Sequence, residues 1–156
     1  MSHELRFERV FDARPEEVFD AFTDPAGLEE MYGLDEPGWV VESEGDVGVG
    51  GTWSVAFGPS RSELYRFTHE FEVIDRPKRV VFRSNELHPD GSSFDAIVEV
   101  TFEGEGAMTL MTLVERGFPS AESRDQHELG LPHAFDRVER FLQAKAADRH
   151  DGRSKR

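Results

Sequence analysis

Residues 63–87 read ELYRFTHEFEVIDRPKRVVFRSNEL, and their alternation of apolar and polar side chains decides the fold. Before the central RPK turn, a period of two gathers a largely aromatic set on one face: Tyr65, Phe67, His69, Phe71 and Val73. The charged and hydroxyl side chains between them fall on the opposite face. Because successive residues of a strand point to opposite sides, the stretch predicts two strands joined by a short turn.

The same period of two recurs on both sides of this hairpin. ELRFERVFD at 4–12, WVVESE at 39–44 and TWSVAF at 52–57 precede it, and SFDAIVEVTF at 93–102 and AMTLMTLVE at 107–115 follow it. The connections HPDGS at 88–92 and EGEG at 103–106 have the length of hairpin turns. We therefore predict one antiparallel sheet of about seven strands.

Three segments have helical rather than strand periodicity. ARPEEVFDAFTDP at 13–25 begins with Pro15 and two acidic residues and predicts a short helix, and a second short helix follows from Pro25 to Gly33. A long helix is predicted from about Ser120 to Ala147, with one apolar stripe formed by Phe135, Val138, Phe141 and Leu142.

Two features of this C-terminal segment lead to further predictions. Gly130 and Pro132 predict a kink or a break in the long helix, because proline removes a backbone hydrogen bond and clashes with the preceding turn. Residues 148–156 are charged and too polar to pack, which predicts a disordered tail after a single domain at 1–147. On the wet side of the helix, Asp136 and Arg140 have the spacing of an ion pair.

The order of the elements defines the fold class. The helices lie outside the run of strands, so they cannot form β-α-β crossovers, and the class is α+β. Since one face of the sheet must be covered, we expect the long helix to lie across it.

Composition excludes several classes of function. The chain has 156 residues and a formal net charge of −14, which disfavours nucleic acid and anionic membrane surfaces as partners. It contains no cysteine, so disulfides, thiolate metal sites and cysteine nucleophiles are excluded. No apolar run has the length of a signal peptide core or a membrane span, which predicts a cytoplasmic protein.

The glycine-rich stretch GDVGVGGTW at 45–53 is a candidate phosphate-binding loop. Such a loop needs a strand before the glycines and a helix after them, because the amides at the helix N-terminus contact the phosphate. Here a strand pattern follows, starting at Trp53. We therefore interpret the glycines as a turn that allows positive φ and close approach of strands.

Four stretches together carry a resemblance to a known family. They are ARPEEVFDAFTDPAGLEEMY at 13–32, VGVGGTW at 47–53, FEVIDRPKRVVF at 71–82 and HELGLPHAFDRVERFL at 127–142. The chain resembles the START-like, birch-pollen-allergen-like superfamily (SRPBCC) over residues 4–145, in the branch named after the activator of heat-shock-protein-90 ATPase. The resemblance implies a helix-grip fold, in which a curved antiparallel sheet wraps around a long helix and encloses an apolar cavity.

This fold predicts the residues that face the cavity. They are Met31, Tyr32, Trp53, Tyr65, Phe67, His69, Phe71, Phe82, Phe94, Val98, Leu131, Phe135 and Val138. The family commonly has tryptophan where this chain has Tyr32 and Leu131, so its ligand specificity does not carry over. The alternative is that the many phenylalanines fill the core and leave no cavity.

The polar candidates are few. His69 and the Tyr65 hydroxyl would be polar groups inside the apolar cavity, or His69 is a satisfied core histidine. HELGLPH offers no metal site, because His127 and His133 are six residues apart with Gly130 and Pro132 between them. We interpret His127 as a solvated helix residue, and Glu70, Glu72 and Glu99 as a solvated sheet face.

Three functions remain open at this point. The first is binding of an apolar or amphipathic small molecule between sheet and helix, without a cofactor. The second is a chaperone-associated or stress-related module; the full activator has an additional N-terminal domain, so we do not expect ATPase stimulation. The third is a cyclase or hydrolase that uses His69 as general base and Tyr65 as hydrogen-bond donor. The resemblance also implies that the domain could form a homodimer through an exposed face.

Overall fold

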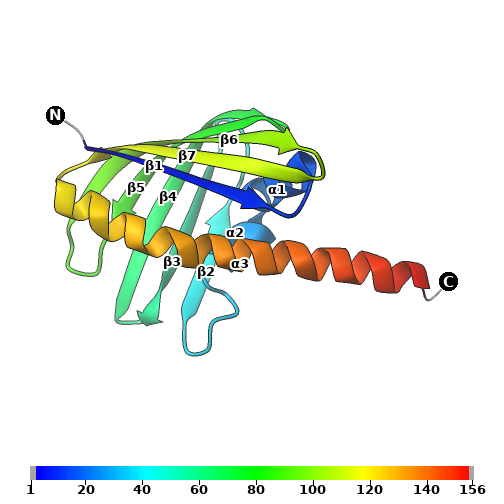
Figure 1. Cartoon of the computed structure of the whole chain (residues 1–156). Helices are drawn as coiled ribbons and strands as arrows, with labels where there is room; N and C mark the ends of the chain where they lie inside the picture. The colour runs from blue at the N-terminus through cyan, green and yellow to red at the C-terminus, as the bar shows by residue number, and fades with distance from the viewer. Residues whose placement is uncertain (1–2, 155–156) are drawn as a thin grey trace.

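The computed structural model describes residues 3–154 and contains one seven-stranded sheet crossed by a long helix. Figure 1 shows this helix, α3, lying across one side of the curved sheet, with its C-terminal part extending beyond the sheet. The elements are β1 His3–Phe11, α1 Pro15–Thr23, α2 Pro25–Met31, β2 Val40–Gly45, β3 Thr52–Ser60, β4 Glu63–Asp75, β5 Arg79–Leu87, β6 Ser93–Glu105, β7 Met108–Phe118 and α3 Ala121–Ser154.

The sheet has the order β1-β7-β6-β5-β4-β3-β2, and every neighbouring pair is antiparallel. From β2 to β7 the chain forms a simple meander, and β1 adds to the free edge of β7. The predicted α+β class, the helix-grip arrangement and the two short helices after the first strand are confirmed.

The two short helices begin as their sequence predicts. Pro15 occupies the first turn of α1, where its missing N–H removes no helical hydrogen bond. The Asp24 carboxylate accepts a hydrogen bond from the backbone N–H of Ala26 at 3.1 Å and caps α2. A Cβ on Gly27 would lie 2.3 Å from the carbonyl oxygen of Ala21, so glycine permits the close contact between the two helices.

The glycine-rich stretch is a turn that leads into β3, as predicted. Gly50 has a φ of +80°, and its N–H donates to the Phe71 carbonyl at 3.0 Å. The Phe71 N–H in turn donates to the carbonyl of Gly51 at 3.2 Å. These bonds hold the turn against β4, and the strand that follows them offers no helix N-terminus to a phosphate.

The prediction that Val73 lies on the inner face of β4 is wrong. The pairing between β4 and β5 shifts register between Phe71 and Val73, as a β-bulge does. Beyond the bulge, Ile74 pairs with the buried Val80 and packs against the core. Val73 is therefore displaced from the face that Phe71 occupies, because the extra residue in the bulge inverts the alternation that follows it.

The predicted break in the C-terminal helix is also wrong, because α3 runs without interruption through Gly130 and Pro132. Both residues are exposed, and so is Glu128, whose carbonyl loses its usual helical donor at Pro132. Water can satisfy that carbonyl, which makes the proline tolerable. The helix extends to Ser154, so most of the segment predicted as a tail has helical backbone, and residues 155–156 lie outside the described residues.

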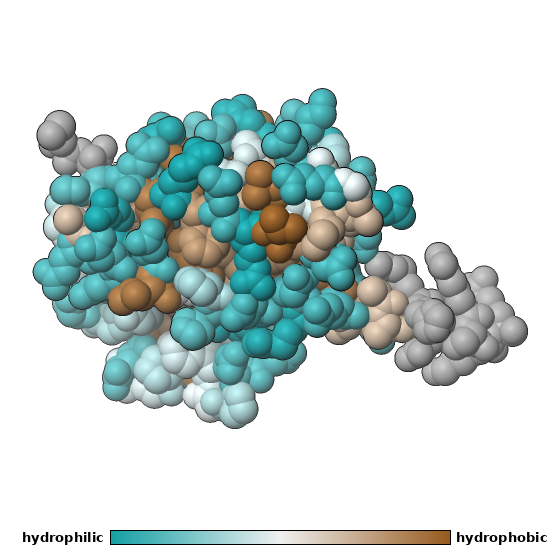
Figure 2. Space-filling model, viewed as in Figure 1, coloured by the Kyte–Doolittle hydropathy of each residue, from teal (hydrophilic) through white to brown (hydrophobic). Residues whose placement is uncertain are grey.

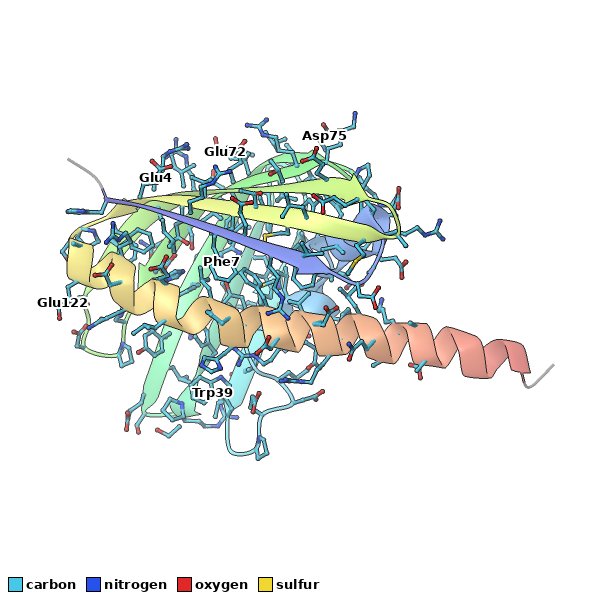
Figure 3. All side chains as sticks on the ribbon, in the orientation of Figure 1. Glu4, Phe7, Trp39, Glu72, Asp75 and Glu122 are labelled. Carbon is cyan, nitrogen blue, oxygen red and sulfur yellow. The ribbon has the colours of Figure 1, made fainter. Side chains whose placement is uncertain are left out.

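The apolar stripe of α3 seals one end of the core. The ring of Phe135 lies 5.3 Å from that of Phe7, 6.3 Å from Phe11 and 5.8 Å from Phe22. Figure 3 shows Phe7 on the side of the sheet that faces α3, whereas Glu72 and Asp75 point to the other side. The outer sheet face is therefore the solvated one.

Ion pairs at the rim of α3 differ from the predicted Asp136–Arg140 pair. Asp136 accepts a hydrogen bond from Arg9 of β1 at 2.7 Å, and Arg140 lies 3.3 Å from Glu36. The first pair connects the helix to β1 and the second connects it to the segment between α2 and β2, so neither bridges the helix's own turns. Most of the face in Figure 2 is hydrophilic. Within residues 3–154 no helix has the length and apolarity needed to cross a bilayer.

Candidate functional site

A cavity of about 320 Å³ lies between the inner face of the sheet and α3. Most of the residues predicted for it line it: Met31, Tyr32, Tyr65, Phe67, His69, Phe71, Phe82, Phe94, Val98, Leu131 and Phe135. The phenylalanines therefore leave a void rather than filling the core. Lining residues that the sequence analysis did not select include Phe22, Phe57, Ser84, Glu86, Glu115, Ala134 and His127.

Two predicted residues, Trp53 and Val138, do not line the cavity. Trp53 is 1% exposed, and its ring packs 6.2 Å from Tyr32 and 5.6 Å from His69. Val138 is completely buried in the core. Both residues are packed in the core behind the residues that line the cavity, so they do not form its surface.

His69 is the polar residue that the alternation of β4 placed in the wall, and it is 3% exposed. Its ring stacks on Phe82 with a centroid distance of 4.3 Å and an interplanar angle of 23°. Burial lowers the pKa of His69 from its ordinary value of 6.5 to about 4, although the negative charge of Glu115 acts in the opposite direction. The imidazole is therefore neutral at neutral pH, and a pKa this low makes it a weak general base.

The hydroxyl that contacts His69 belongs to Tyr32, not to Tyr65. Tyr32 Oη lies 3.2 Å from His69 Nε2, within hydrogen-bond distance. Burial, together with the charges of Glu86 and Glu115, raises the pKa of Tyr32 well above its ordinary value. Tyr32 lines the cavity and presents its hydroxyl there. Tyr65 instead stacks on Phe57 at a centroid distance of 5.4 Å.

A second polar group in the wall was missed by the sequence analysis. Glu86 of β5 and Glu115 of β7 are 2% and 3% exposed, and both lie against His127 of α3. His127 Nδ1 is 3.5 Å from Glu86 Oε1, and His127 Nε2 is 3.2 Å from Glu115 Oε1. We call Glu86, Glu115 and His127 the carboxylate–histidine cluster. The imidazole bridges two carboxyl groups that lie on strands separated by β6.

The prediction that His127 is solvated is wrong. Its side chain is 21% exposed, and its ring lies 6.4 Å from Phe67 and 5.2 Å from Phe118. The signal was present in the sequence, because His127 precedes Leu131 by four residues and therefore belongs to the buried stripe of the helix. Likewise, alternation in β5 puts Glu86 on the face of Phe82, and in β7 it puts Glu115 on the face of Leu113.

The two carboxyl groups of the cluster have opposite protonation tendencies. Burial raises the pKa of Glu86, and the neighbouring charge of Glu115 raises it further. Burial opposes the ionisation of Glu115, but the hydrogen bond and charge of His127 and a hydrogen bond with Glu86 act together to lower the pKa of that carboxyl. In the absence of a bound ion, these directions make Glu86 the acid and Glu115 the carboxylate of the pair.

This arrangement gives the wall two chemical capacities. The Tyr32–His69 pair is neutral and can exchange hydrogen bonds with a ligand. The carboxylate–histidine cluster can donate a proton, accept one or hold a cation, and its three ligand atoms lie within 4.8 Å of one another. The cluster is the group of residues in the described chain that could hold a metal ion.

The sequence matches the family model described as Activator of Hsp90 ATPase homolog 1-like protein over residues 12–143. The chain belongs to the AHSA1-like family. This family is part of the SRPBCC superfamily, so the resemblance inferred from the four motifs is confirmed. None of the curated proteins matches the chain. The AHSA1-like description names the family only, and chaperone contact and homodimer formation stay predictions.

Several solved structures have the same fold as this chain. Protein CV1439 from Chromobacterium violaceum superposes with a TM-score of 0.75 at 23% identity, over 89% of this chain and 96% of that one. A putative uncharacterized protein from Rhizobium leguminosarum gives a TM-score of 0.81 at 18% identity, over 92% and 96% of the two chains. A protein of unknown function from Staphylococcus aureus, SA2116, gives 0.76 at 17% identity, over 94% and 97%. At these identities the likeness is one of architecture.

Proposed function

We propose that this AHSA1-like protein binds one small amphipathic molecule in the cavity between the sheet and α3. The observation that carries the proposal is a cavity of about 320 Å³ with a largely aromatic wall and two separate polar groups in it. Ligand sites in proteins have this composition: apolar surface supplies most of the affinity, and a few placed polar groups fix the orientation.

The size of the cavity limits the class of ligand. A volume of about 320 Å³ is at the lower end of the range for small-molecule sites and equals the volume of about ten water molecules. A two-chain phospholipid is too large for it. We therefore expect a compact molecule with an aromatic or short aliphatic body.

The polar groups indicate how such a molecule lies. Its apolar body would pack among Phe67, Phe82 and Phe94, whose rings line the cavity. Its polar end would exchange a hydrogen bond with the neutral Tyr32–His69 pair or donate one to Glu115. The weak basicity of His69 supports a binding role for this residue over the general-base role considered from the sequence.

The proposal is tested with the fluorescent probe N-phenyl-1-naphthylamine, a compact apolar amine. We expect saturable 1:1 binding by the full chain, with emission enhanced as the probe leaves water. Ala134→Trp introduces an indole at a position on α3 that lines the cavity, and it should weaken probe binding at least tenfold.

Ala144→Trp is the matched control, because Ala144 is exposed on the same helix. It should bind the probe like the unmodified protein. Equal binding by both tryptophan variants would place the probe outside the cavity and reject the proposal, and so would the absence of saturable binding.

A further inference from the structure

We infer that the carboxylate–histidine cluster is a binding site for one divalent transition-metal ion, held by Glu86, Glu115 and His127 in the wall of the cavity. The inference goes beyond the proposed function, because metal binding at this place requires no organic ligand. An ion there would nevertheless face the cavity, where its free coordination positions could meet a bound molecule.

The geometry of the three side chains is the first argument. They come from three different elements, β5, β7 and α3, and their ligand atoms lie within 4.8 Å of one another. Ligands bonded to one ion at about 2.0–2.2 Å lie roughly 3–3.5 Å apart at tetrahedral or octahedral angles. Glu115 Oε1 and His127 Nε2 already have this spacing, at 3.2 Å.

Glu86 occupies the other side of the imidazole. Its Oε1 lies 3.5 Å from His127 Nδ1, so the ring presents one nitrogen to each carboxyl group. A single ion would take one of these nitrogens, and the second carboxylate would turn about its own side-chain torsions to reach it. Phe67 and Phe118 pack against the imidazole and restrict its position, so the carboxylates rather than the ring would move.

Poorly satisfied oxygens in the cluster are the second argument. Glu86 Oε1 and Glu115 Oε2 are buried, and among the described residues neither accepts a hydrogen bond of good geometry; the nitrogen beside Glu86 Oε1, His127 Nδ1, is 3.5 Å away. Buried polar atoms nearly always have a partner, so two such oxygens in one cluster point to a bound group. Both glutamates line the cavity, which gives that group a route to them.

A divalent cation fits the charges of the cluster. Within the described residues, the ion pairs of Glu86 and Glu115 involve His127 and neither lysine nor arginine. Arg137 also lines the cavity, but its Nε donates to the Met31 carbonyl at 3.0 Å. A divalent ion would displace the proton of Glu86 on binding, and its charge would then balance two carboxylates beside a neutral imidazole.

The donor set narrows the choice of metal. Two carboxylate oxygens and one imidazole nitrogen suit Zn²⁺, Co²⁺, Mn²⁺ and Fe²⁺, whereas Mg²⁺ and Ca²⁺ prefer oxygen alone. The absence of cysteine from the chain rules out a soft thiolate contribution. We expect Zn²⁺ and Co²⁺ to bind and Mg²⁺ to compete poorly.

The test uses the full chain, stripped of metal with a chelator, and titrated with Zn²⁺ by calorimetry and with Co²⁺ by visible absorption. We expect one equivalent of each ion to bind, with a Kd in the micromolar range or below. Glu115→Gln and His127→Gln should each weaken binding at least tenfold, since each removes a ligand. His133→Gln is the matched control, because His133 is exposed on the same helix and should not matter.

A second measurement needs no variant and therefore does not depend on how well the variants fold. In protein labelled with ¹⁵N at histidine, one equivalent of paramagnetic Co²⁺ should shift or broaden the ring signals of His127 and leave those of His133 in place. Unchanged His127 signals, or equal Zn²⁺ affinity in the protein and in His127→Gln, would overturn the inference.

The ligand-binding proposal and the metal-binding proposal can be rejected independently of each other. Binding of N-phenyl-1-naphthylamine is measured in the presence of chelator, and metal binding is measured without the probe. Loss of the metal result leaves the cavity as an organic ligand site, and loss of the probe result leaves the cluster as a metal site.

Discussion

The Tyr32–His69 pair and the carboxylate–histidine cluster are two polar groups in the same apolar wall, and they tolerate burial in different ways. His69 is 3% exposed and loses its charge, since burial lowers its pKa to about 4. Glu115 is equally buried but keeps its charge, because His127 stabilises the carboxylate. The comparison teaches that a buried group without an opposite charge is neutralised, whereas one with such a partner stays ionised.

The largest expected effect comes from removing the partner that keeps Glu115 ionised. His127→Leu places an apolar side chain against Phe67 and Phe118, where the imidazole packs, and leaves two buried carboxyl groups without that imidazole. Breaking a buried ion pair costs about 3–5 kcal/mol, and the partial exposure of His127 places the expected loss in unfolding free energy at about 3–4 kcal/mol. Urea denaturation at pH 7 measures it.

The second carboxyl group provides the control for this variant. Adding Glu115→Gln to His127→Leu removes the stranded charge and should restore part of the lost stability. A double variant that is less stable than His127→Leu alone would contradict the ion-pair explanation.

A smaller effect is expected from the neutral pair, as a dependence of stability on pH. The pKa of His69 is about 4 in the folded protein and 6.5 for an unperturbed histidine, so between these values the unfolded chain binds the additional proton. The contribution of His69 to stability is therefore complete above pH 6.5 and is lost as the pH falls towards 4. Between pH 7 and pH 4.5 this loss amounts to about 2 kcal/mol.

His69→Phe isolates that contribution, because phenylalanine can keep the stacking on Phe82 but does not titrate. Its unfolding free energy should fall less than that of the unmodified protein over the same pH range. Parallel pH profiles for the two proteins would show that His69 is not buried in its neutral form.

The smallest effect on stability is expected at Glu86. Stability depends on pH there in the opposite direction from that at His69. The pKa of Glu86 is raised in the folded protein by burial and by Glu115, so the folded state holds a proton that the unfolded chain releases as the pH rises above 4.5. Stability therefore decreases with rising pH at this residue. Glu86→Gln, a neutral side chain of the same shape, should be more stable at pH 7 by about 1 kcal/mol, or about 3 °C in Tm. A lower Tm would indicate that Glu86 is ionised.

Much of the fold, and the position of His69 in the cavity wall, could be predicted from the sequence. Period-two alternation placed His69 on the aromatic face of β4, and the same rule would have placed Glu86 and Glu115 on inner faces. They were overlooked because each belongs to a different strand and appears alone among apolar neighbours. Only the curvature of the sheet and the seating of α3 bring them to His127, and no local pattern specifies either.

The errors in local structure have related causes. The bulge after Phe71 exchanges Val73 for Ile74 on the inner face, and one extra residue leaves no signature in an alternating stretch. Pro132 predicted a break in α3, but the carbonyl it leaves without a donor is on the exposed side of the helix. The pairing with β5 decides the first case and solvent exposure decides the second, and neither follows from the local sequence.

The central claim, that the cavity binds a small amphipathic molecule, is tested most directly by locating the bound probe. In protein labelled with ¹⁵N at histidine, saturating N-phenyl-1-naphthylamine should shift the ring signals of His69 and His127, which line the cavity, and leave those of the exposed His133 unchanged. Enhanced probe fluorescence without any change at His69 and His127 would contradict the account.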